Sequence, residues 1–60
     1  MSNIAAYQEG YTDGYDTKRE RDKEMLNRFI SEQMKIEPVN DYLKGYNQAL
    51  RELKQIVEVL

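Results

Sequence analysis

The residues with the most distinctive spacing are three tyrosines near the N-terminus. Tyr7, Tyr11 and Tyr15 recur at every fourth position, and Gly10 and Gly14 form a row of small residues beside them. On a helix, residues four apart share one face. Rigid amphipathic rings are favoured at protein interfaces, and small residues let a neighbouring helix or ring approach the backbone. These five residues are therefore the predicted partner-binding surface.

The carboxylates around these tyrosines argue against two other kinds of chemistry. Aromatic rings also stack on single-stranded bases, but Glu9, Asp13 and Asp16 would repel the phosphates. Nine basic and eleven acidic residues give a net charge of −2, without the basic surface typical of a nucleic-acid binder. Catalytic carboxylates need a water-poor pocket that shifts their pKa values, which so short a chain hardly encloses. Nucleic-acid binding is thus a disfavoured function, and an enzyme is not expected.

Metal and cofactor chemistry leave no signal in the sequence. The chain has no cysteine and no histidine, so thiolate and imidazole ligands are both absent. It also lacks a glycine-rich phosphate loop, an HExxH motif and the EF-hand spacing. We expect no catalytic residue, no metal site, no cofactor and no small-molecule substrate. The first apolar run, residues 4–6, is too short for a signal peptide or a membrane span, which favours a cytoplasmic protein without membrane partners.

The C-terminal third carries the clearest structural pattern. Its apolar residues fall in three rows with a spacing of seven: Val39, Tyr46, Leu53 and Leu60; Tyr42, Ala49 and Ile56; Leu43, Leu50 and Val57. Three filled heptad rows predict an amphipathic helix of coiled-coil type over 38–59. Pro38 is tolerated in a first helical turn, and the residue before a proline avoids helical angles, so 35–37 is a predicted connection.

The N-terminal half is predicted as one helix over 4–34 with a weak arm at 1–15. Apolar residues from Met25 to Met34 have helical spacing, whereas Gly10 and Gly14 each cost a helix up to about 1 kcal/mol. A frayed arm with a turn at residues 13–14 is the alternative. The fully polar segment between Asp16 and Glu24 indicates either a solvated helix or a charged docking surface. The fold class is then all-α: one domain, an antiparallel two-helix hairpin over 1–60.

A faint internal repeat relates the two ends of the chain. Residues 35 positions apart match in the pattern Tyr-x-x-Gly-Tyr-x-x-small-apolar: Tyr7, Gly10, Tyr11, Gly14, Tyr15 and Arg19 align with Tyr42, Gly45, Tyr46, Ala49, Leu50 and Lys54. The match indicates a duplicated docking element, and chance within ordinary helix patterning is the alternative.

The predicted hairpin leaves apolar residues without cover. Folding back at 35–38 places Leu53, Ile56, Val57 and Leu60 opposite the charged stretch 13–21, where each would forfeit roughly 1.5–3 kcal/mol of burial. Such surface usually marks an interface. Two copies pairing through these helices would form a four-helix assembly. The predicted dimer interface consists of Tyr46, Ala49, Leu50, Leu53, Ile56, Val57 and Leu60.

These patterns predict a small helical protein-binding module, a homodimer that binds and modulates or inhibits another protein. Small cofactor-free chains are common among phage and mobile-element accessory proteins, including inhibitors, which would act in the host cytoplasm. The alternative is a structural component that polymerises through the C-terminal heptad face. Sixty residues without disulfides form only a marginal core, which favours self-association or folding on a partner.

Overall fold

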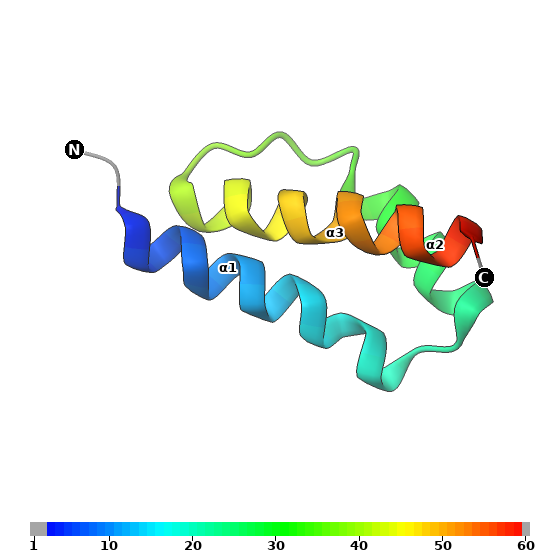
Figure 1. The fold of residues 1–60 in the computed structure, drawn as a ribbon. Coiled ribbons are helices and arrows are strands. Elements are labelled where there is room, and N and C mark those ends of the chain that lie inside the picture. The colour runs from blue at the N-terminus through cyan, green and yellow to red at the C-terminus, as the bar shows by residue number, and fades with distance from the viewer. Residues whose placement is uncertain (1–2, 60) are drawn as a thin grey trace.

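A computed structural model describes residues 3–59. This part of the chain forms α1 (Ile4–Asp16), the short 3-10 helix η1 (Thr17–Glu20), α2 (Lys23–Gln33) and α3 (Asp41–Val59), and it contains no strand. The predicted all-α class is confirmed. The predicted two-helix hairpin is wrong, because the described residues form three α-helices (Figure 1).

The N-terminal arm is an ordered helix. The side chain of Asn3 accepts a hydrogen bond from the backbone N–H of Ala6 at 3.1 Å, which satisfies one of the free amides of the first turn. Helix α1 then runs through Gly10 and Gly14 to Asp16. The alternative of a turn at residues 13–14 is therefore wrong.

The predicted continuous helix over 4–34 is also wrong, because the chain changes direction between η1 and α2. Arg21 is extended, with φ −130° and ψ 137°. Asp22 then caps α2, its carboxylate accepting a hydrogen bond from the backbone N–H of Met25 at 2.8 Å. Residues 16–24 have no apolar side chain that a straight helix would bury. The local cap at Asp22 therefore decides where α2 begins.

Helix α3 begins at Asp41 rather than at the predicted residue 38. The side chain of Asn40 accepts a hydrogen bond from the N–H of Leu43 at 2.8 Å, so Asn40 is the N-cap. Pro38 and Val39 lie in the connection, which returns along α3 from the end of α2 to the start of α3 (Figure 1). This long return makes α3 run parallel to α1.

The aliphatic core lies between α2 and α3. It consists of Leu26, Ile30, Leu50, Leu53 and Val57, with Tyr15, Phe29, Met34 and Tyr46 packed against it. Leu53 and Val57 are therefore buried within one chain, and the expectation that they lack apolar cover is wrong. The physical reason is the break after η1, which turns α2 so that Leu26 and Ile30 cover the C-terminal half of α3 (Figure 1).

Candidate functional site

Helices α1 and α3 cross with their backbones in contact at all three glycines of the chain, most closely at Gly10 and Gly45. A Cβ atom at Gly10 would overlap the carbonyl oxygen of Tyr42 and lie 2.8 Å from its carbonyl carbon. A Cβ atom at Gly45 would overlap the carbonyl oxygen of Tyr7 in the same way, 2.9 Å from that carbon. Only glycine allows so close an approach, so these two positions set the distance between the helices.

The crossing has an approximate two-fold symmetry, which relates the two copies of the internal repeat. The symmetry exchanges the Gly10–Tyr42 contact with the Gly45–Tyr7 contact, because Gly45 and Tyr42 stand 35 positions after Gly10 and Tyr7. The next nearest atoms match as well. A Cβ atom at Gly10 would lie 3.1 Å from the N atom of Tyr46, and one at Gly45 would lie 3.0 Å from the N atom of Tyr11. The two copies of the repeated pattern therefore dock on each other, side by side and parallel (Figure 1).

Tyrosine hydroxyls on one helix donate to carboxylates on the other. Tyr11 and Tyr15 both donate to Oε1 of Glu52 at 3.0 Å, and Tyr42 donates to Oδ2 of Asp13 at 2.5 Å. The hydroxyl of Tyr15 and the carboxylate of Glu52 raise the pKa of Tyr11. The hydrogen bond to Asp13 raises the pKa of Tyr42 to about 12, and the Tyr11 hydroxyl lowers the pKa of Glu52.

These contacts change the interpretation of the predicted partner-binding surface. Gly10 and Gly14 are buried against α3, and Tyr11 and Tyr15 are half-buried beside it. Within the single chain, α3 runs parallel to α1 and covers this face (Figure 1). Tyr7 keeps 38% of its surface exposed. A role of these five residues in binding another protein stays a prediction.

The predicted dimer interface divides into a buried and an exposed part. Four of its members are buried within the single chain: Ala49, Leu50, Leu53 and Val57. Tyr46 is half-buried against the core, whereas Ile56 is 47% exposed. Leu60 lies outside the described residues. The residue of this set that remains open to a partner is Ile56, and Val59 beside it is 86% exposed.

Ile56 forms one wall of a groove between η1, α2 and α3. The groove has a volume of about 470 Å³ and is lined by three cations and four aliphatic side chains: Lys18, Arg19, Lys23, Leu26, Leu53, Ile56 and Val57. No carboxylate lines it, although the chain as a whole carries a net charge of −2. The groove therefore combines an apolar floor with a rim of three cations, of which Arg19 is paired with Asp16.

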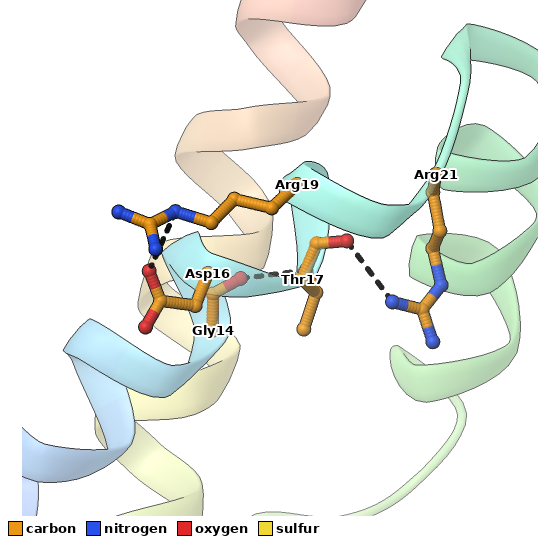
Figure 2. A network of polar contacts seen from close by, with 5 residues as sticks. All are labelled: Gly14, Asp16, Thr17, Arg19 and Arg21. Atoms are coloured by element: carbon orange, nitrogen blue, oxygen red, sulfur yellow. Dashed lines mark hydrogen bonds and ion pairs between the residues drawn. The ribbon is translucent and has the colours of Figure 1, made fainter.

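Polar contacts at the end of α1 shape the cationic rim. Figure 2 shows the hydroxyl of Thr17 donating to the carbonyl of Gly14 at 2.6 Å and Arg21 donating to the carbonyl of Thr17 at 3.0 Å. Arg19 lies 3.6 Å from Asp16, an exposed ion pair (Figure 2). The guanidinium of Arg21 also stacks on the ring of Phe29 at 3.9 Å, a cation–π contact. Together these contacts fix η1 against α1 and α2.

Comparisons with known proteins give no match to a family model, to a curated protein or to a solved structure. Within residues 3–59, no cluster of carboxylates could hold a metal ion. In the same part of the chain, no helix has the length and hydropathy needed to cross a membrane.

Sequence reasoning missed the groove and the partners of the tyrosines. The groove draws on three segments separated along the chain. The predicted hairpin placed Ile56 opposite the charged segment but gave this region no apolar floor. Glu52 could not be identified either, because ordinary helices carry many exposed glutamates. The repeat could have identified Gly45, since it pairs Gly45 with Gly10.

Proposed function

We propose that the chain is a protein-binding module whose groove between η1, α2 and α3 takes an acidic amphipathic segment of another protein. The observation that carries the proposal is the composition of the groove: an aliphatic floor beside Lys18, Arg19 and Lys23, with no carboxylate among its lining residues. An apolar anchor on the partner would cover the exposed side chain of Ile56. Acidic residues flanking that anchor would meet the cationic rim, which steers association and favours acidic partners.

A partner segment held in the groove would be blocked from its other contacts. Binding would therefore modulate or inhibit the partner. The phage or mobile-element origin and the cytoplasmic setting remain proposals that rest on size and composition. Polymerisation through the heptad face is the less favoured function, because most of that face is buried inside the chain.

The probe is a synthetic helical peptide with two leucines on one face, flanked by glutamates, and a matched peptide with lysines in place of the glutamates. We expect the acidic peptide to shift the amide resonances of groove residues in ¹⁵N spectra and to bind more weakly as salt is added. Lys18→Glu with Lys23→Glu should weaken binding about tenfold or more. Ile56→Asp should weaken it as well, without unfolding a chain in which Ile56 is 47% exposed.

The matched control is Lys35→Glu with Lys44→Glu, which makes the same charge change at exposed positions that do not line the groove. It should bind the acidic peptide nearly as well as the wild type. Equal binding of the acidic and basic peptides, or an equal loss in the two double variants, would contradict the proposal.

A further inference from the structure

The contact between α1 and α3 is of the kind that two copies of one helix make. Gly10 packs on Tyr42 as Gly45 packs on Tyr7, so the two helices contact each other through equivalent faces. A self-complementary surface related by a two-fold axis is the defining property of a symmetric dimer interface. Here both halves belong to one chain.

Helix α1 contributes little to the aliphatic core. Its buried residues are Gly10 and Gly14, whereas the five buried core residues all belong to α2 and α3. Backbone proximity and hydrogen bonds hold α1, including the bond from the backbone N–H of Asn3 to Asp41 at 2.8 Å. The aliphatic residues of the core therefore come from α2 and α3, and α1 adds the ring of Tyr15 against them.

The segment between α1 and α2 has no apolar side chain of its own to expose when it straightens, although the stacking of Arg21 on Phe29 would be lost. Residues 16–24 contain no apolar side chain, and extended angles at Arg21 and Asp22 make the break between η1 and α2. Most of these residues are good helix formers, and Lys18 and Asp22 form a favourable pair at i, i+4. A straight helix over 4–33 would be about 45 Å long, and its first turns would lie out of reach of α3 in the same chain.

From these observations we infer that two copies of this chain exchange α1. The segment 17–22 becomes helical, and each α1 docks on α3 of the other copy through the contacts that it makes within one chain. The exchange keeps every α1–α3 contact, so the equilibrium between monomer and dimer depends on the conformation of the segment 17–22 and on protein concentration. This inference does not rest on the peptide groove, and it places the dimer contact at the glycine crossing rather than at the predicted heptad face.

Two substitutions should shift this balance in opposite directions. Lys23 is the first residue of α2, where proline is well tolerated, and Asp22 before it has the extended angles that precede proline. Lys23→Pro thus suits the closed chain but breaks a straight helix, and it should raise the dimer dissociation constant roughly 100-fold or more. Asp22→Ala removes the cap of α2 and should lower the dissociation constant several-fold.

The experiment combines sedimentation equilibrium from micromolar to millimolar concentration with isotope-filtered NMR on a mixture of ¹³C-labelled and unlabelled chains. We expect a monomer–dimer equilibrium, with dimers enriched in Asp22→Ala and depleted in Lys23→Pro. In the mixed dimer, an intermolecular NOE should join the Hα of Gly14 to the methyl of Ala49, which face each other across the crossing. An Asp22→Ala chain that stays monomeric at millimolar concentration would overturn the inference, as would a dimer that lacks this NOE or is unchanged by Lys23→Pro.

Discussion

Adding one methyl group at Gly10 should loosen the docking of α1. The Cβ atom of Gly10→Ala would overlap the carbonyl oxygen of Tyr42 and lie 3.1 Å from the backbone N atom of Tyr46. Both neighbours are backbone atoms, so neither can rotate away as a side chain could. Relief requires the two helices to separate by an amount on the order of 1 Å, which also lengthens the hydrogen bond between Tyr42 and Asp13.

The expected magnitude is the balance of two opposing terms. Overpacking a well-packed contact costs about 1–3 kcal/mol, and the rigid backbone neighbours place Gly10→Ala at the upper end. Alanine in place of a mid-helix glycine returns up to about 1 kcal/mol of helix propensity. The net loss is therefore about 1–2 kcal/mol, or a fall in Tm of roughly 5–15 °C for a domain of this size.

Urea and thermal unfolding followed by circular dichroism measure this loss. Thr12→Ala is the matched control, because Thr12 is an exposed residue of α1 where alanine improves helix propensity without a clash. Gly45→Ala should cost about as much as Gly10→Ala, since the two contacts are related by symmetry. The double variant should lose less than the sum, because one separation of the helices relieves both clashes. If Gly10→Ala were as stable as Thr12→Ala, the close crossing would be refuted.

Two further predictions concern pH and the core. The folded pKa of Tyr42, about 12, lies above the ordinary value of 10, so its hydrogen bond to Asp13 stabilises the fold below pH 10 and is lost as the pH rises from 10 through 12; thermal melts across this range should show the decline, and Tyr42→Phe should reduce it. Leu50→Ala removes a fully buried core side chain and should cost about 2–5 kcal/mol by urea unfolding, whereas Val59→Ala, at an 86% exposed position, should change stability by less than about 0.5 kcal/mol.

Helical periodicity predicted which residues are helical but not that the N-terminal half is divided into two helices. The spacing of Leu50, Leu53 and Val57 identified α3 and its buried face. The break near Arg21 could not be predicted in the same way, because the residues around it favour a helix and only the cap at Asp22 distinguishes the two outcomes. That single local choice brought the apolar face of α2 onto the C-terminal half of α3.

The candidate site was predictable only where it depended on the repeat. The glycine and tyrosine pattern indicated close docking, and the structure confirms that both copies of the pattern take part in a close helix contact. The sequence pattern assigned that contact to another protein, whereas in the structure α3 of the same chain makes it. The groove depends on the turn after η1, so it could not be predicted before the turn was known.

Glycines alone would not fix the register of α1 on α3. Gly10 and Gly14 are four residues apart, as are Gly45 and Ala49, so a slip of one helical turn would place small residues opposite each other again. The same slip would bring Thr17 to the place of Asp13 beside Tyr42, so the hydroxyl of Tyr42 would lose the carboxylate that it binds. A slip in the opposite direction would keep a carboxylate, that of Glu9, beside Tyr42, but it would place Ala6 where only Gly10 fits against the carbonyl of Tyr42. The close glycine contacts and the bond between Tyr42 and Asp13 therefore fix the register together.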